Sequence, residues 1–224
     1  MNSYDQKKAF EYEEGFLLTS GITRTAKILA LYEAYKMIRD VPGVVVECGV
    51  YKGLSFATLA TLRSLTENSS MRKLIGFDTF DKFALTSDTR DKKIVEEIET
   101  VSGLECISTS DLMSYLSKKG VGVSENIDLV KGDICFTAKA FAEENPGTRI
   151  ALLSIDVDFG EPTQAILDYL YPLVTVGGVV LIDDYGTFPS ESDVIDSFIE
   201  KNGYRLRQFP FARHPCYLIK GEKR

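Results

Sequence analysis

One stretch, from Ile150 to Gly186, most constrains the fold of this chain. It reads IALLSIDVD, then the helical pattern EPTQAILDYLYPLV, then GGVVLIDDYG. Two buried parallel strands joined by one crossover helix explain this order, so we expect an α/β sheet. The acids of this stretch would meet at the carboxyl edge of the sheet, where open α/β sheets bind their ligands. They are Asp156, Asp158, Asp183 and Asp184. Since neighbouring carboxylates repel one another, we predict a divalent cation among them.

Length and charge limit the classes of protein to consider. The chain has 224 residues, enough for one well-buried α/β domain. Its net charge of -7 argues against a nucleic-acid partner, because binding to phosphates rests on clustered lysines and arginines. The first ten residues, MNSYDQKKAF, do not resemble a signal peptide, and no apolar run approaches the length of a membrane helix. We therefore expect a cytoplasmic protein without a membrane partner.

An amphipathic helix is predicted before the first strand. Between Thr23 and Asp40, apolar side chains such as Ile28, Leu31 and Tyr35 recur at three- and four-residue spacing. Residues 1–20 are either a short extra helix or a flexible arm. We therefore divide the chain into an N-terminal helical extension, residues 1–40, and a main domain, residues 41–224. The extension is a candidate dimer interface, so we include a homo-oligomer, in which the partner is another copy of this chain, among the expectations.

The first strand runs directly into a glycine-bearing turn, VVVECGVYKGLS. Such a strand-turn-helix start is where nucleotide-like cofactors bind in doubly wound folds, although a purely structural turn can look the same. The pattern is E-x-G-x-x-x-G-x-S, formed by Glu47, Gly49, Gly53 and Ser55. A carboxylate at the strand end would repel a pyrophosphate but attract a cationic ligand, so we predict S-adenosylmethionine as the cofactor.

Two further acids end the next two strands. Asp78 closes the predicted strand KLIGFDTF, at the position where such folds bind both ribose hydroxyls of the cofactor. Asp133 closes NIDLVKGDI and is equally compatible with two interpretations. It either lies near the adenine ring or caps the following helix.

A long segment of about 45 residues, 81–125, separates the second and third strands. It contains two helical patterns, and an ordinary crossover needs far less chain. We interpret it as a helical insertion and possible substrate lid, although a surface helical hairpin remains an alternative. Further on, Ser190 is predicted to cap a helix that ends at Gly203. Two short strand-like runs, YRLRQF and CYLIK, then predict a terminal antiparallel hairpin.

Together these motifs resemble the class I S-adenosylmethionine-dependent methyltransferases, and more narrowly the macrocin O-methyltransferase family. The resemblance rests on VECGVYKGLS, GFDTF, LVKGD, LLSIDVDFGEPT and LYPLVTVGGVVLIDDYG, in this order. It implies a Rossmann-like fold, with a mostly parallel seven-stranded sheet, helices on both faces and a closing antiparallel hairpin. It also implies methyl transfer to a hydroxyl of a sugar, either a nucleotide-linked deoxysugar or a sugar of a natural product.

The resemblance further implies roles for individual residues. Asp156, Asp183 and Asp184 match the Mg²⁺ ligands of the family, and Asp158 matches an acid suited to act as general base. The matches to cofactor-binding positions are Glu47, Gly49, Gly53, Ser55 and Asp78. The family commonly has Trp-Arg-Gly-Gly where this chain has Tyr-Lys-Gly-Leu from Tyr51 onward. That change lies on the expected substrate side, so it bears on the acceptor more than on the reaction.

Alternatives to a sugar methyltransferase remain open from sequence alone. A catechol-like small molecule could also chelate a metal through adjacent oxygens. The DVDFGEPT segment is superficially similar to the start of Mg²⁺-dependent phosphohydrolases, and a non-catalytic cofactor-binding module could retain the same fold. Asp156 and Asp158 point to the same side only if their strand continues through Asp158. His214, the only histidine, lies in the terminal hairpin turn and is a weaker candidate for the base.

Overall fold

The structure is a computed structural model, and it describes residues 4–68, 70–84, 86–121 and 126–223. Its seven-stranded sheet has the order β3-β2-β1-β4-β5-β7-β6. The strands are β1 (Val44–Cys48), β2 (Leu74–Asp78), β3 (Ile127–Lys131), β4 (Ile150–Ile155), β5 (Val174–Ile182), β6 (Arg207–Gln208) and β7 (Cys216–Ile219). The first five strands pair in parallel, whereas β7 pairs antiparallel with β5 and β6. The predicted mostly parallel seven-stranded sheet and its terminal antiparallel hairpin are therefore confirmed.

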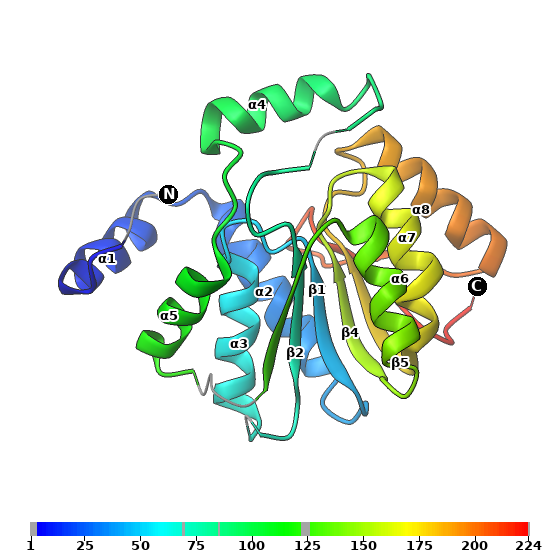
Figure 1. The fold of residues 1–224 in the computed structure, drawn as a ribbon, viewed down its shortest axis with the longest axis horizontal. Helices are drawn as coiled ribbons and strands as arrows, with labels where there is room; N and C mark the ends of the chain where they lie inside the picture. The colour runs from blue at the N-terminus through cyan, green and yellow to red at the C-terminus, as the bar shows by residue number, and fades with distance from the viewer. Residues whose placement is uncertain (1–3, 69, 85, 122–125, 224) are drawn as a thin grey trace.

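Helices cover both faces of this sheet (Figure 1). The α-helices are α1 (Ala9–Thr19), α2 (Ile22–Met37), α3 (Leu54–Thr66), α4 (Lys92–Ser102), α5 (Thr109–Lys119), α6 (Ile134–Glu144), α7 (Gly160–Tyr169) and α8 (Pro189–Asn202). Short 3-10 turns lie at Gln6–Lys8 and Tyr171–Leu173. One apolar core joins the sheet to α2, α3 and α5, and a second joins it to α6, α7 and α8.

The central strands explain why the sequence shows continuous apolar runs. Every residue of β4 is buried, and β1 is buried from its second residue onward. A parallel strand with helices on both faces has no solvent-facing side, so alternation between polar and apolar residues is lost. The same arrangement leaves the ends of these strands as the place for polar side chains.

The insertion between β2 and β3 holds α4 and α5. Helix α5 contributes Leu112 and Leu116 to the core, whereas α4 has no buried residue. Figure 1 shows α4 above the sheet and apart from the other helices. Its half-buried apolar residues are Ile94, Val95 and Ile98. The insertion therefore consists of an exposed helix, α4, and a helix packed on the core, α5.

The start of α8 differs from the sequence-based expectation. Phe188 is the residue before the helix and makes no cap, Pro189 is the first helical residue, and the Ser190 N–H donates to Asp91 Oδ1 at 3.4 Å. The predicted capping role of Ser190 is therefore wrong. Proline at the first helical position has no N–H to satisfy, and the Asp91 carboxylate accepts the hydrogen bond of the next N–H, that of Ser190. The Ser190 hydroxyl is used in a different contact, described below.

The N-terminal arm, residues 4–20, is helical but exposed. Helix α1 contains no buried residue, and Figure 1 shows it away from the sheet. Its recorded contacts with the rest of the chain include a hydrogen bond from the Tyr4 N–H to the Tyr115 hydroxyl, 3.0 Å long. Within the described residues, no helix is long and apolar enough to cross a membrane.

Candidate active site

The glycine turn after β1 is shaped by a close approach between two strands. Gly49 has a φ of +93°, and a Cβ at this position would lie 1.6 Å from the carbonyl oxygen of Asp156. No other residue fits there. Gly53 has a φ of +85° and stands directly before α3. Gly49 thus fixes the distance between the glycine turn and the acidic end of β4.

Asp78 holds the glycine turn in place. Its Oδ2 accepts hydrogen bonds from the N–H groups of Val50 and Tyr51, at 2.9 and 2.8 Å. Its Oδ1 accepts a hydrogen bond of 2.7 Å from the Phe80 N–H. The carboxylate nevertheless lines the cavity described below. Carboxylate oxygens each accept more than one hydrogen bond, so this arrangement is compatible with the predicted ribose contact.

Glu47 lies behind the wall of the site. Its side chain is fully buried, and neither carboxylate oxygen has a hydrogen-bond partner among the described residues. Burial raises the pKa of Glu47 to about 8. The carboxyl therefore holds its proton at neutral pH, because charge without solvent or a partner is costly. Glu47 and Gly53 do not line the cavity, whereas the predicted cofactor residues Gly49 and Ser55 do.

Asp133 performs one of its two predicted roles. Its Oδ1 accepts a hydrogen bond of 2.9 Å from the Cys135 N–H, so it caps α6. Asp133 also lines the cavity, together with Gly132 and Ile134. A contact with the adenine ring therefore remains a prediction beside the capping role.

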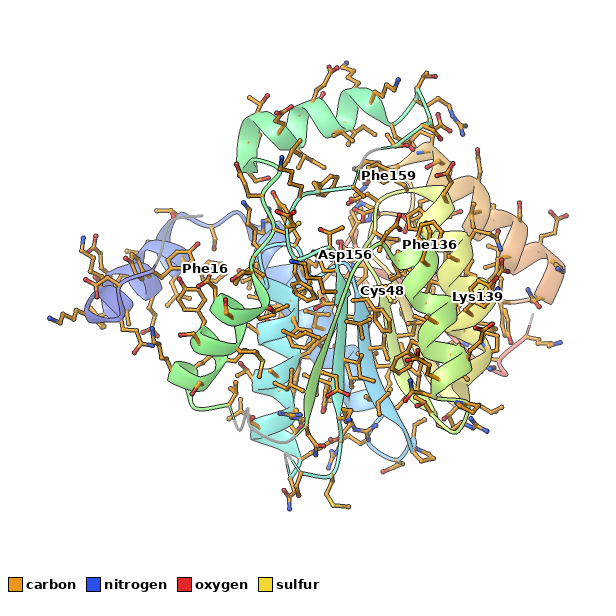
Figure 2. The ribbon with its side chains drawn as sticks, viewed as in Figure 1. Phe16, Cys48, Phe136, Lys139, Asp156 and Phe159 are labelled. Carbon is orange, nitrogen blue, oxygen red and sulfur yellow. The ribbon has the colours of Figure 1, made fainter. Side chains whose placement is uncertain are left out.

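Three of the four acids singled out in the sequence converge as predicted. Strand β4 ends at Ile155 and β5 ends at Ile182, so Asp156, Asp183 and Asp184 follow these strand ends directly. Each offers a carboxylate oxygen, and these oxygens lie within 4.8 Å of one another. Figure 2 shows Asp156 at the end of the sheet that faces α4. We call these three residues the acidic trio.

Asp158 reaches the site by a route that the sequence did not predict. The strand does not continue through it, and its φ of +64° is unfavourable for a non-glycine residue. The condition under which Asp156 and Asp158 would point to the same side, a strand continuing through Asp158, is therefore not met. Burial, together with the charge of Asp156, raises the pKa of Asp158 to about 8. Such strained residues often occur at functional sites.

Lys27 is a site residue that sequence reasoning missed. It projects from α2, and its Nζ lies 2.9 Å from Asp156 Oδ2 and 2.6 Å from Asp183 Oδ2. Burial lowers the pKa of Lys27, but the two carboxylates outweigh this effect and hold the pKa above its ordinary value. Burial and the Asp183 charge raise the pKa of Asp156 to about 6, although Lys27 opposes this shift. The lysine is therefore charged and neutralises part of the trio.

A second missed group connects the insertion to the site. The Gly160 N–H donates a hydrogen bond of 2.8 Å to Ser190 Oγ, and this hydroxyl donates one of 2.5 Å to Asp91 Oδ2. Asp91 is fully buried and stands directly before α4. Gly160 follows Asp158 by two residues. The insertion is therefore tied through one serine to the backbone that carries Asp158.

Glu191 is a further buried acid beside the trio. It is fully buried in the first turn of α8, and neither of its carboxylate oxygens has a hydrogen-bond partner among the described residues. Burial, and then the charges of Asp158 and Asp156, raise its pKa well above the ordinary value. The sequence pattern predicted the helix that contains Glu191, but it did not indicate that this side chain is buried.

One large cavity joins the glycine turn to the acidic trio. Its volume is about 1080 Å³, and its lining includes residues of the turn, the trio, α2 and the insertion. Three aromatic residues that line it form edge-to-face pairs, Tyr51 with Phe83 and Phe83 with Phe159, and Phe159 also pairs with Phe188 behind the lining. Such pairs stabilise packing between segments. They hold the insertion against the body of the protein above the cavity.

His214 lies at the edge of this site and does not line the cavity. It is half-buried, and its Nε2 is 3.4 Å from the Thr187 hydroxyl. Burial, followed by the charges of Arg213 and Lys27, lowers its pKa. The weaker candidacy of His214 as the base is consistent with this position.

Comparisons with known proteins agree with this geometry. A curated relative, demethyldecarbamoylnovobiocin O-methyltransferase of Streptomyces niveus, is 37% identical over 79 residues. The alignment covers 34% of this chain and 30% of that protein, so the chain spans less than a third of the relative it matches.

Solved structures match nearly the whole fold. The structure of CalS11, a calicheamicin methyltransferase, has a TM-score of 0.73 at 26% identity, over 99% of this chain and 95% of that one. A second CalS11 structure, described as a TDP-rhamnose 3'-O-methyltransferase, has a TM-score of 0.72 at 28% identity, over 99% and 89% of the two chains. The O-methyltransferase NovP shares the fold, with a TM-score of 0.69 at 20% identity over 88% of this chain and 80% of its own.

The family assignment comes from a match over most of the chain. The family described as macrocin O-methyltransferase (TylF) matches residues 19–207, which include the glycine turn, the insertion and the acidic trio. The protein therefore belongs to the macrocin O-methyltransferase family.

Proposed function

We propose that this protein transfers a methyl group from S-adenosylmethionine to a hydroxyl of a sugar, with Mg²⁺ held by the acidic trio. The acceptor is a nucleotide-linked deoxysugar or a sugar of a natural product. One observation carries the proposal: a single cavity is lined by both the glycine turn and all three acids. A cofactor on the turn and an acceptor at the trio would thus share one enclosed space.

The acidic trio has the donor chemistry that Mg²⁺ prefers. Hard carboxylate oxygens are its usual protein ligands, and it keeps positions for water or substrate oxygens. Asp184 Oδ2 is buried and has no hydrogen-bond partner among the described residues. The other two acids already bind a positive charge, the Lys27 ammonium. The site therefore fits a cation, and Asp156, Asp183 and Asp184 would hold it.

Asp158 is suited to take the proton of the acceptor hydroxyl. S-adenosylmethionine supplies an activated methyl group, and Mg²⁺ lowers the pKa of an oxygen that it binds. A sugar hydroxyl still needs a proton acceptor at neutral pH. The raised pKa of Asp158 makes it a stronger base than an exposed aspartate, and added positive charge beside it shifts its pKa down toward neutrality.

The remaining residues position the reactants. Gly49 allows the backbone of the turn to lie against Asp156, and this close contact keeps the cofactor turn at a fixed distance from the trio. Phe83 and Phe159 form an apolar wall on the cavity and help to exclude water. Correct alignment of the reacting atoms accounts for several kcal/mol of a typical barrier reduction.

The sugar acceptor is supported by the relatives. CalS11 is described as acting on TDP-rhamnose, and it aligns with 99% of this chain at 28% identity. The cavity, at about 1080 Å³, is slightly larger than the usual range of ligand-site volumes, about 300 to 1,000 Å³, which leaves room for a cofactor and an acceptor together.

The test is a titration of the purified protein with S-adenosylmethionine, with Mg²⁺ and after EDTA, followed by turnover of a panel of nucleotide-linked sugars, sugar-bearing natural products and catechols. We expect cofactor binding in both conditions and turnover of sugar acceptors only with Mg²⁺. Asp156→Asn should keep cofactor binding and lose turnover.

The control variant is Asp168→Asn on the exposed side of α7, where the side chain bonds to Gln164. It should behave as the wild type does. Failure to bind S-adenosylmethionine in any condition would refute the proposal. Full turnover after EDTA would refute the role of Mg²⁺ alone, and turnover of catechols but not sugars would replace the acceptor class.

A further inference from the structure

The buried contact of Lys27 involves two of the carboxylates that a metal ion would need. Its Nζ lies 2.9 Å from Asp156 Oδ2 and 2.6 Å from Asp183 Oδ2. Among the described residues, these are the recorded ion pairs of both acids. The ammonium thus bridges two of the three carboxylates of the trio.

A divalent cation and this ammonium cannot both occupy the bridge. Mg²⁺ binds carboxylate oxygens at about 2.0–2.1 Å. A cation held by the same two oxygens would lie in contact with the ammonium, and like charges at that distance in a buried site repel strongly. Either the lysine moves away when metal binds, or the metal is excluded.

The position of Lys27 makes such a movement possible. Lys27 lies in the second turn of α2, and its stem is a flexible chain of four carbons. It also lines the cavity, as do Arg24 and Ile28 beside it on the helix, so the displaced ammonium has open space to enter. The backbone of α2 is anchored further on by the buried residues Leu31 and Tyr35.

We propose that Lys27 is an internal competitor of the divalent cation, which neutralises Asp156 and Asp183 in the metal-free protein and lowers the affinity of the trio for metal. The inference rests on the proposed Mg²⁺ site. It assigns to Lys27 a role in setting metal affinity. Metal binds appreciably only when the free energy of its binding to the carboxylates exceeds the free energy lost with the two ion pairs of Lys27.

The experiment measures metal affinity directly. Mg²⁺ and Mn²⁺ are titrated calorimetrically into the full chain without cofactor or acceptor, for the wild type, Lys27→Met and Lys27→Arg. Lys27→Met should bind both cations at least about tenfold more tightly, which corresponds to about 1.4 kcal/mol. Lys27→Arg retains the positive charge and should stay close to the wild type. Lys36→Met is the matched control on the same helix, because Lys36 is exposed and its contacts, an ion pair with Glu33 and a cation–π contact with Tyr32, are local.

A second measurement keeps the test valid if Lys27→Met folds poorly. In Lys27→Ala, added ethylammonium should replace the missing side chain and weaken Mn²⁺ binding in proportion to its concentration, whereas the same salt should leave Lys36→Ala unaffected. Equal or weaker metal binding by Lys27→Met, or no effect of ethylammonium, would overturn the inference while leaving the metal site intact. Absence of metal binding in every variant would overturn both the inference and the proposed Mg²⁺ site.

Discussion

Asp158 offers the sharpest test at the scale of single residues. Asp158→Asn keeps the shape of the side chain but cannot accept the proton. We expect kcat to fall by about 10²- to 10⁴-fold, with S-adenosylmethionine affinity nearly unchanged. In the wild type, the rate should rise with pH as Asp158 loses its proton, with a midpoint below about 8 when Mg²⁺ is bound, because the cation lowers this pKa. The variant should lack this rise.

His214 provides the comparison for this prediction. It lies at the edge of the site and does not line the cavity. His214→Ala should therefore retain most of the activity and the same pH profile as the wild type. A thousandfold loss in His214→Ala, with activity retained in Asp158→Asn, would assign the base to the histidine.

Glu47 gives a prediction for stability against pH. Its pKa is about 8 in the folded protein against an ordinary value of 4.5, because burial disfavours the charged carboxylate. The folded state therefore binds this proton more tightly than the unfolded state does. The stability that the proton provides is complete below pH 4.5 and is lost progressively as pH rises to 8. Glu47→Gln, which cannot ionise, should gain stability relative to the wild type over this interval, by at most a few kcal/mol.

The measurement for Glu47 is the difference in urea-unfolding free energy between variant and wild type, at several values of pH from 4.5 to 9 and without cofactor. The difference should grow up to about pH 8 and then become constant. A difference independent of pH would show that Glu47 ionises normally in the folded protein.

At the scale of elements, the buried contact between Asp91 and Ser190 connects the insertion with α8 and with the start of α7. Asp91→Ala leaves the partly buried Ser190 hydroxyl without its acceptor. We expect a loss of about 1–3 kcal/mol in unfolding free energy. Hydrogen exchange in α4 should become faster, while exchange in β1 stays unchanged. Turnover should fall, since Gly160 belongs to the segment that carries Asp158.

The neighbouring exposed contact is the control for Asp91. Arg90 pairs with Asp193 at 2.9 Å, and both side chains are largely exposed. Exposed ion pairs contribute little, about 0–1 kcal/mol, so Asp193→Ala should change neither stability nor exchange in α4 appreciably. Equal effects of the two substitutions would show that the buried contact has no special role.

These elements also show where sequence reasoning succeeds. The acidic trio could be predicted because each acid follows an apolar run, and parallel strands end at a common edge. Lys27 could not, because it lies 129 residues before Asp156 and interrupts an otherwise ordinary amphipathic helix. Asp91 and Ser190 were missed for the same reason, since their contact joins segments 99 residues apart. Ser190 even carried a misleading local signal, that of a helix cap.

At the scale of the whole molecule, the sequence predicted the type of the sheet, mostly parallel with a terminal antiparallel hairpin, but not the order of its strands. Buried parallel strands give continuous apolar runs, and the antiparallel hairpin gives two short ones, so both are visible locally. That the insertion acts as a lid over the substrate stays a prediction. The backbone of Asp158 was not predictable, because a positive φ at a non-glycine residue is imposed by tertiary packing.

The last prediction concerns how copies of the molecule associate. The N-terminal arm exposes large apolar side chains: Phe10 and Leu17 are 70% exposed and Leu18 is 83% exposed. Exposed apolar residues gathered on one segment are typical of interaction surfaces. We expect the wild type to form a homo-oligomer through this arm.

Sedimentation velocity at several protein concentrations measures this association. The triple variant Phe10→Ser, Leu17→Ser, Leu18→Ser should sediment as a smaller species than the wild type, because it removes the apolar area that would be buried between copies. Val101→Ser, which changes an 86%-exposed residue of α4, should leave the wild-type mass unchanged. If the wild type stays monomeric at every concentration, the prediction that the arm forms an oligomer interface is wrong. Reduced mass in Val101→Ser alone would transfer the interface to α4.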